Sequence, residues 1–188
     1  MTLRHSIVIY LFEMEVALEH KDSKKVKLDH VDQLILDDLQ KNGRITNVQL
    51  AKNAGISAPP CLRRVRALEE DGFILGYHAE LDATLLDFKE MFFALVGLSS
   101  QAQTVLKEFE DQVSAWSEVR ECHMIRGGGD FLLKIVARDK EQRDALTMKL
   151  TSAENVIKVT TLETIRTSKK LPGVPIVFKQ SEDSLGEE

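Results

Sequence analysis

Six basic side chains occur within residues 41–68, a stretch of the chain that contains no acidic residue. They are Lys41, Arg44, Lys52, Arg63, Arg64 and Arg66. Acidic residues flank this basic run, with Asp37 and Asp38 before it and Glu69 and Glu70 after it. Lysine and arginine in such a cluster bind the phosphates and base edges of nucleic acids. A solvated basic face gives the same count, so the order of residues along the run must decide between the two interpretations.

The whole chain has 188 residues, and its 25 lysines and arginines against 30 aspartates and glutamates give a net charge of −5. This balance excludes a globally basic nucleic-acid binder but is compatible with a locally basic one. Hydrophobic residues make up 43% and charged residues 29%, which is typical of a folded protein rather than a disordered one. The length suits one large domain or two small domains.

Signals for other chemistry are weak. Cys61 and Cys122 are too few for a disulfide framework and lack metal or redox spacing, which favours a reduced cytoplasmic setting. We find no Ser/His/Asp set, no paired carboxylates and no metal-ligand spacing. The longest apolar stretch, residues 7–18, is interrupted by Glu13 and Glu15 and is shorter than the ~20 residues of a membrane helix. We therefore expect a cytoplasmic protein without catalytic residues, a metal or a membrane partner.

Two helices are predicted at the start of the basic run. Apolar residues at helical spacing predict a first helix over residues 28–40, which Asn42 and Gly43 end. Thr46 and Gln49 form the T-x-x-Q pattern of a capping box, which predicts a second, short helix. The side chains that this second helix is expected to bury are Val48, Leu50, Ala51 and Ala54.

The third helix starts with two consecutive prolines. A residue that precedes proline avoids the helical conformation, so Ala58 and Pro59 are expected to lie before a helix running from about Pro60 to Asp71. Because prolines have no N–H to donate, the Ser57 hydroxyl lacks a helix N–H to cap. We therefore predict that Ser57 contacts a DNA phosphate instead.

The orientation of the third helix follows from its period of about 100° per residue. Arg63 and Arg66 lie at about 200° and 140° from the side expected to be buried. That side consists of Cys61, Val65 and Leu68. Arg64 lies on the flank and is better placed to pair with an acid of its own domain. A helix, a tight turn and a second helix place that second helix in the major groove of DNA. The predicted DNA contacts are Arg44, Ser57, Pro59, Arg63, Arg64 and Arg66.

The second half of the chain follows a different pattern. Residues 73–81 are β-prone and predict a wing or linker strand. Strands are then predicted at 91–98, 119–125, 131–137 and 156–167, with helices after the first and third of these. The order β-α-β-β-α-β is the ferredoxin-like plan, which leaves one sheet face and an edge uncovered and favours dimerisation.

Three consecutive glycines, Gly127, Gly128 and Gly129, precede Asp130 between two of these strands. One interpretation is a tight hairpin with no further role. The other is a binding site, in which a small molecule approaches bare backbone N–H groups and the Asp130 carboxylate meets an α-amino group. His123, on the preceding strand, is the further candidate side chain, although a lone histidine on a strand is more often packed.

Many spaced residues resemble the Lrp/AsnC (leucine-responsive, feast/famine) regulators over residues 28–170. They include Leu28-Asp29-x-x-Asp32, Asn42-Gly43-Arg44, Cys61-x-x-Arg64-Val65-x-x-Leu68-Glu69, Gly72-x-Ile74-x-Gly76-Tyr77 and Gly129-Asp130-Phe131. The resemblance implies an α+β protein in which an N-terminal winged helix-turn-helix domain is joined to a C-terminal ferredoxin-like domain that senses amino acids. It also implies dimers that assemble further, often into octamers, with effectors bound near the glycine loop between subunits. In this chain, Gly128 and Gly129 replace the acid and the aromatic residue of the family loop.

The pattern divides the chain into four parts. Residues 1–27 form an N-terminal extension of unassigned role, and residues 28–89 form the DNA-binding domain, with the helix-turn-helix at 47–66. Residues 90–170 form the ferredoxin-like amino-acid-sensing and oligomerisation domain, and residues 171–188 form a flexible acidic tail.

The function that we expect is a homo-oligomeric, sequence-specific transcriptional regulator that binds double-stranded DNA and is modulated by an amino acid bound between subunits. No other cofactor is expected. One alternative is a nucleoid-organising protein that wraps DNA with little sequence preference. Another, from the enzyme class, is a haem-precursor decarboxylase, for which His123 is the main candidate residue.

Overall fold

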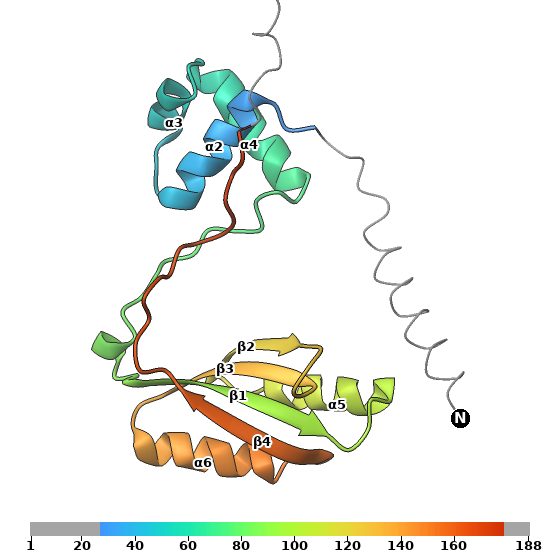
Figure 1. Cartoon of the computed structure of the whole chain (residues 1–188). Helices are drawn as coiled ribbons and strands as arrows, with labels where there is room; N and C mark the ends of the chain where they lie inside the picture. The colour runs from blue at the N-terminus through green and yellow to red at the C-terminus, as the bar shows by residue number, and fades with distance from the viewer. Residues whose placement is uncertain (1–26, 179–188) are drawn as a thin grey trace, which may run out of the picture. The chain divides into compact units, whose positions relative to one another are not determined.

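The computed structural model describes residues 27–178, which form two compact units (Figure 1). The N-terminal unit contains residues 27–79 and also residues 171–178, whereas the C-terminal unit contains residues 80–170. The chain thus leaves the first unit after residue 79 and returns to it after residue 170. Residues 1–26 and 179–188 lie outside the described residues, and with them most of the predicted extension and the end of the predicted tail. No helix within residues 27–178 is long and apolar enough to cross a membrane.

Three helices make up the N-terminal unit: α2 (His30–Lys41), α3 (Asn47–Asn53) and α4 (Ala58–Glu70). Their buried side chains form one apolar cluster, with Ile35 and Cys61 at 0% exposure and Leu50 at 2%. Ala51, Ala54 and Leu68 complete this core. The three predicted helices are therefore confirmed. Val48, which we expected to be buried on α3, is 71% exposed, because it lies about 200° from Leu50 around the helix.

Side-chain caps fix where the first two helices begin. Asp29 caps α2 by accepting the Asp32 N–H (2.9 Å), and the Asp32 carboxylate accepts the Asp29 N–H in return (3.1 Å). Thr46 caps α3 by accepting the Gln49 N–H. The capping box predicted there is wrong in its second half, because the Gln49 amide donates to the Asn53 side chain instead.

Helix α4 begins two residues earlier than predicted, at Ala58. The prolines at its second and third positions replace N–H groups that have no partner in the first turn of any helix, so they cost no hydrogen bond. Ser57 precedes the helix and its side chain makes no cap hydrogen bond, as predicted. The strand predicted at residues 73–81 is absent, since residues 74–82 are neither helix nor strand.

The C-terminal unit has the β-α-β-β-α-β order that the sequence predicts. Its elements are β1 (Glu90–Leu98), α5 (Gln103–Ser114), β2 (Val119–Met124), β3 (Phe131–Ala137), α6 (Lys140–Thr151) and β4 (Val156–Glu163), preceded by the short helix η1 (Thr84–Leu86). All strand pairs are antiparallel, and the sheet order is β2-β3-β1-β4. The last strand ends four residues before the predicted boundary at residue 167.

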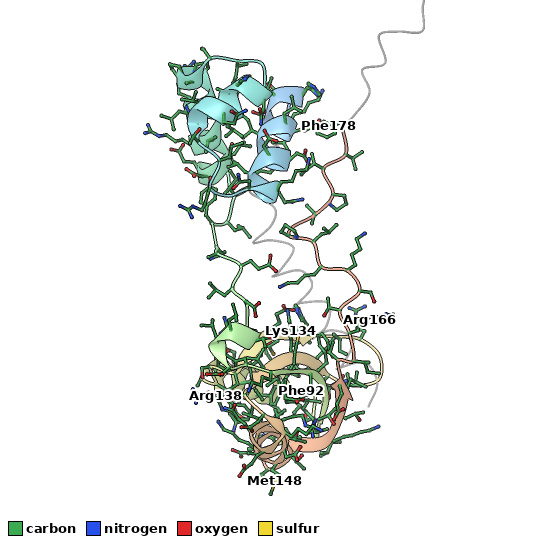
Figure 2. All side chains as sticks on the ribbon, turned by 90° about the vertical axis from the view of Figure 1, so that its left-hand side faces the viewer. Phe92, Lys134, Arg138, Met148, Arg166 and Phe178 are labelled. Atoms are coloured by element: carbon green, nitrogen blue, oxygen red, sulfur yellow. The ribbon has the colours of Figure 1, made fainter. Side chains whose placement is uncertain are left out.

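Both helices of this unit pack on one face of the sheet. The core contains Phe92 of β1, Phe131 of β3, Phe109 of α5 and Leu150 of α6, each at most 1% exposed. Figure 2 shows Phe92 inside this unit, with Lys134 and Met148 of α6 on opposite sides of it. Alternate residues of β1 and β3 point away from the helices and remain half-buried. Within residues 80–170, one face of the sheet is thus left without a covering layer.

Gly129 shows where the C-terminal unit tolerates no side chain. A Cβ atom at residue 129 would lie 2.9 Å from the Val96 carbonyl oxygen and 3.0 Å from the Leu95 side chain. We expect Gly129→Ala to lower the free energy of unfolding of this unit by about 1–3 kcal/mol, because backbone must move to admit the methyl group. Trp116, the single tryptophan, is buried in the unit, so its fluorescence in a urea titration measures the change.

Gly128→Ala is the matched control, because its Cβ would meet only the Leu95 side chain at an ordinary 3.5 Å. Equal stability of the two variants would show that the close approach at residue 129 is not a constraint on the fold.

Candidate nucleic-acid interface and effector loop

The outward side of α4 carries two exposed arginines. Arg63 and Arg66 are exposed, and neither makes an ion pair within the described residues. The opposite side of the helix is fixed in the core by Cys61 (0% exposed) and Leu68 (3%). The predicted orientation is therefore confirmed: burial of one side of α4 projects both guanidinium groups toward solvent.

Arg64 has a different role from its two neighbours. Its guanidinium group contacts carboxylate oxygens of Asp29 and Asp32, both at 2.7 Å. These carboxylates belong to the capping box of α2, so the arginine joins the start of α2 to α4. Ion pairing to both carboxylates raises the pKa of Arg64. Arg64 is one of the predicted DNA contacts, but its guanidinium group is already engaged by its own domain, as its position on the flank of the helix indicates.

The other basic residues of the run also fall into two groups, those in an ion pair and those without one. Lys41 pairs with Asp37 one turn earlier on α2, and this contact raises its pKa. Four of the six bases then remain without an ion pair in the part of the chain that the structure describes: Arg44, Lys52, Arg63 and Arg66. Arg44 is exposed in the turn between α2 and α3, and Ser57 and Pro59 are exposed at the start of α4.

Polar contacts hold α4 in place against its neighbours. The Asn47 side-chain amide donates to the Ala58 carbonyl (2.9 Å), which joins the start of α3 to the first residue of α4. The Tyr77 hydroxyl donates to Glu69 (2.9 Å) at the other end of α4. Partial burial, together with this carboxylate, raises the pKa of Tyr77 to about 12. Neither contact is predictable from the sequence, because the spacing around Asn47 and Tyr77 does not indicate which residue each one binds.

The glycine loop joins β2 to β3 and is held closely against β1. The Asp130 N–H donates to the Val96 carbonyl (2.8 Å), and its carboxylate accepts from the Leu98 N–H (2.7 Å) and the Gln101 amide (3.0 Å). Both Asp130 oxygens therefore already hold the loop in place. The N–H groups of residues 127–129 have no acceptor within residues 27–178.

His123 lies on β2 opposite Leu132 of β3 and is exposed. Its ring nitrogen lies 3.2 Å from a Glu121 carboxylate oxygen, and the other Glu121 oxygen accepts from Lys134 (2.6 Å). The pKa of Glu121 is lowered, most by the hydrogen bond from Lys134 and next by the contact with His123. One surface hollow of this unit is lined by other residues: Glu108, Phe109, Gln112, Glu154 and Asn155. The structure thus brings His123 into a charged cluster on the sheet rather than into that hollow.

We searched residues 27–178 for side chains that could bind a metal ion. No group of three histidine, cysteine, aspartate or glutamate side chains within residues 27–178 is arranged to hold a metal ion. Cys61 and Cys122 are both free thiols.

Comparison with known proteins gives two family matches. Residues 28–74 match the family described as winged helix-turn-helix DNA-binding. Residues 91–174 match the family described as Lrp/AsnC ligand binding domain. Together the two matches cover both units of the structure.

The chain is also similar to curated proteins over most of their length. A leucine-responsive regulatory protein from Rhizobium meliloti (strain 1021) is 49% identical over 146 residues, which is 77% of this chain and 94% of that protein. The leucine-responsive regulatory protein from Escherichia coli (strain K12) is 46% identical over 116 residues, covering 60% of this chain and 71% of that protein.

Two solved structures share the fold. An AsnC family transcriptional regulator from Agrobacterium tumefaciens is 30% identical, covers 79% of this chain and 97% of its own, and has a TM-score of 0.74. A transcriptional regulator from Neisseria meningitidis in complex with L-Met has the same identity and coverage and a TM-score of 0.75.

The ion pairs of Arg64 lead to a prediction about the N-terminal unit. Arg64→Ala should lower its stability by about 1 kcal/mol, because the pairs are partly exposed and two carboxylates lose their partner. The pKa of Asp29 is held below its ordinary value of 3.8, chiefly by the Asp32 N–H and further by Arg64. A lowered carboxyl pKa stabilises the fold above that ordinary value, and the contribution is lost as pH falls below it.

We therefore expect the stability difference between wild type and Arg64→Ala to be constant from about pH 5 to 7 and to shrink below about pH 4. Hydrogen exchange of the buried amides of α4 measures this difference in stability across the pH range. A difference that grows on acidification would contradict the assignment.

Proposed function

Because the chain belongs to the Lrp/AsnC family of DNA-binding transcriptional regulators, we propose that α4 is its recognition helix and that Arg63 and Arg66 contact DNA directly. The single observation that carries this proposal is that both are exposed, with no ion partner among the described residues, on a helix whose other side is buried. In the major groove a guanidinium group donates two hydrogen bonds to the O6 and N7 atoms of a guanine, and at the edge of the groove it binds phosphate oxygens. Arg44, Ser57 and Pro59 supply further contacts, and Arg64 holds α4 in position.

Ser57 fits the role of a phosphate contact. Its side chain is exposed at the start of α4 and makes no cap hydrogen bond, because prolines occupy the positions whose N–H groups it would accept. A hydroxyl that the fold does not use is available to donate to a phosphate oxygen.

We assign self-association to the open face of the sheet. Half-buried apolar side chains occupy this face on β1 and β3, and Leu162 of β4 is 50% exposed beside them. They are Met91, Phe93, Leu95, Leu132 and Val136, whose alternation with buried residues places them opposite the helices. A second copy of the sheet would remove this surface from water, and two-fold pairing would set the spacing of two DNA half-sites.

We assign the amino-acid effector to the glycine loop. The N–H groups of Gly127, Gly128 and Gly129 suit the carboxylate of an amino acid, as backbone donors do in other anion sites. Asp130 fixes the end of the loop, and His123 lies on the adjacent strand. The similar Neisseria meningitidis regulator was solved as a complex with L-Met, which supports an amino acid as the ligand class.

We further propose that the protein has no catalytic activity and works in the cytoplasm, where the chromosome of a bacterium lies. The bacterial relatives named above are regulatory proteins, which supports both statements.

Selection from random DNA duplexes tests the function as a whole. The full-length protein should enrich a motif with two-fold symmetry, and at least one of the twenty amino acids should change the enrichment or the assembly state. Recovery of unselected sequence would contradict a sequence-specific regulator and would favour a protein that wraps DNA with little preference.

Charge removal at Arg63 tests the contact itself. Arg63→Gln should weaken binding to the selected duplex by about tenfold, and the slope of log affinity against log salt should fall by about 0.9 if one phosphate contact is lost. Ser57→Ala should weaken binding by about threefold while leaving the thermal stability unchanged, because the hydroxyl makes no cap bond.

Arg166→Gln is the matched control, since Arg166 is an exposed arginine of the C-terminal unit with no ion pair among the described residues. An affinity and salt slope of Arg63→Gln equal to those of this control would refute the contact.

A further inference from the structure

A short uncharged segment after the sensing domain belongs to the DNA-binding unit. Residues 171–178 fold with residues 27–79 and contain no charged side chain. Gln40 of α2 makes two hydrogen bonds with Val174 of this segment. The Gln40 amide donates to the Val174 carbonyl (2.8 Å), and the Val174 N–H donates to the Gln40 amide oxygen (3.0 Å). A side-chain amide of α2 thus holds the backbone of the segment by donor and acceptor together.

Gly173 and Phe178 extend this attachment. Gly173 has φ +62, a conformation that favours glycine, and a Cβ atom there would collide with the Gln40 side chain. The ring centroids of Phe178 and His30 lie 5.7 Å apart, edge to face, and Figure 2 shows Phe178 beside the helices of this unit. Gln40 is near the end of α2 and His30 is its first residue, so the segment runs along the helix toward its start. Residue 178 therefore lies beside the start of α2.

The residues that follow Phe178 are acidic. Residues 179–188, which we call the acidic end, contain four acids and one base, a net charge of −3. The acids are Glu182, Asp183, Glu187 and Glu188, and the base is Lys179. All the charge of residues 171–188 thus follows the attached segment. A negatively charged stretch that begins at a fixed point of this unit is attracted to unpaired bases of the same unit.

The start of α2 adjoins the basic side of α4. Asp29 directly precedes His30, and its carboxylate accepts a hydrogen bond from Arg64 of α4 at 2.7 Å. Arg63 is the neighbour of Arg64 along α4, and Arg66 is two residues further on. Both are exposed, and neither makes an ion pair within residues 27–178. The point where the acidic end begins is therefore joined, through His30 and Asp29, to the helix that carries these two arginines.

The acidic end is long enough to reach them. Its four acids lie four to ten residues after Phe178, so they reach from about 13 Å to about 35 Å from it. Two packed helices have axes about 8–10 Å apart and are each about 10–12 Å across, so α2 and α4 together are about 20 Å wide. Arg44 lies past the other end of α2, a helix about 18 Å long. Arg63 and Arg66 are thus the nearer targets.

We propose that the acidic end binds Arg63 and Arg66 in the absence of DNA and competes with DNA for them. Carboxylates accept from guanidinium groups the same charge-assisted hydrogen bonds that phosphates accept. The attachment of residues 171–178 to α2 keeps the local concentration of these acids high, in the millimolar range that short tethers give. Exposed ion pairs are individually weak, so a duplex displaces the acidic end at a cost of a few-fold in affinity. The competition with DNA rests on the proposed function, whereas the contact between the acidic end and α4 does not.

Arginine modification of the full-length protein without DNA tests the contact. In the tail variant, the four acids are neutralised by Glu182→Gln, Asp183→Asn, Glu187→Gln and Glu188→Gln. A neutral dicarbonyl reagent at about 50 mM salt should modify Arg63 and Arg66 about threefold faster in the tail variant than in wild type, because their ion pairs are removed. Arg166 of the C-terminal unit should react equally in both proteins. Unchanged reactivity of Arg63 and Arg66 would overturn the contact.

A charge-matched variant separates this contact from an effect of net charge. It replaces with glutamine four acids of the C-terminal unit that make no ion pair among the described residues: Glu108, Glu110, Glu141 and Glu154. Its net charge equals that of the tail variant, but its acidic end is intact. Arg63 and Arg66 should react in it as they do in wild type. Acceleration equal to that of the tail variant would show a general effect of charge and would overturn the contact.

Affinity for the selected duplex tests the competition. The tail variant should bind about threefold more tightly than wild type at about 50 mM salt, and the ratio should fall toward one at about 300 mM, because salt screens the internal ion pairs. Gln40→Ala keeps the net charge and should gain about twofold, because the loosened segment lowers the local concentration of the acids.

Three results would count against parts of this account. Equal affinity of the tail variant and wild type at low salt would overturn the competition, and equal affinity of Gln40→Ala and wild type would overturn the role of the attachment. Failure of wild type and the tail variant to bind any duplex would instead contradict the proposed function. The modification experiment needs no DNA, so it would still decide the contact between the acidic end and α4.

Discussion

The burial of one side of α4 is the constraint on which the DNA-binding surface depends. Cys61 and Leu68 are almost fully enclosed by α2 and α3, and a helix fixed on one side must expose the other. With about 100° between successive residues, this leaves Arg63 and Arg66 no orientation except outward. Polar contacts at both ends, from Asn47 and from Tyr77, then limit how far the helix can rock. Apolar packing, rather than the charges themselves, therefore sets the orientation of the two arginines.

The distribution of charge follows from the same arrangement. A chain with a net charge of −5 presents a basic surface only where acids are absent or already paired. The fold achieves this by pairing the carboxylates next to the helices internally: Asp29 and Asp32 bind Arg64, and Asp37 binds Lys41. Two bases of the run thereby pair with three of the nearby carboxylates, and the other four bases make no ion pair within residues 27–178. Of the three arginines on α4, Arg64 is thus engaged within the fold, whereas Arg63 and Arg66 remain exposed for the proposed recognition.

Local patterns predicted the elements well and their contacts poorly. Helical spacing and the order of strands are properties of short segments, so three helices and the β-α-β-β-α-β plan could be derived from them. The start of α4 could not be derived in this way. The residue before a proline usually avoids the helical conformation, but Ala58 is helical here, in a first turn where the two prolines cost no hydrogen bond. The exposure of Val48 could have been found by applying the angular test to α3 as well.

Long-range contacts had no signal in the sequence. Gln40 and Val174 are separated by 134 positions, and nothing in either segment names the other. The Asp130 carboxylate was expected to meet a ligand, and its bonds to Leu98 and Gln101 depend on how closely the loop approaches β1. The same approach explains why residue 129 is glycine here, since even a methyl group would meet the β1 backbone.

Chemical modification of arginine side chains tests the central claim most directly. An arginine-specific reagent is applied to the full-length protein with and without the selected duplex, and the modified residues are identified by mass spectrometry. The account predicts that DNA protects Arg63 and Arg66, while the reactivity of Arg64, held by two carboxylates, and of Arg166 in the C-terminal unit stays unchanged. Equal modification of Arg63 and Arg66 in the free and bound protein would contradict the assignment of α4 as the recognition helix.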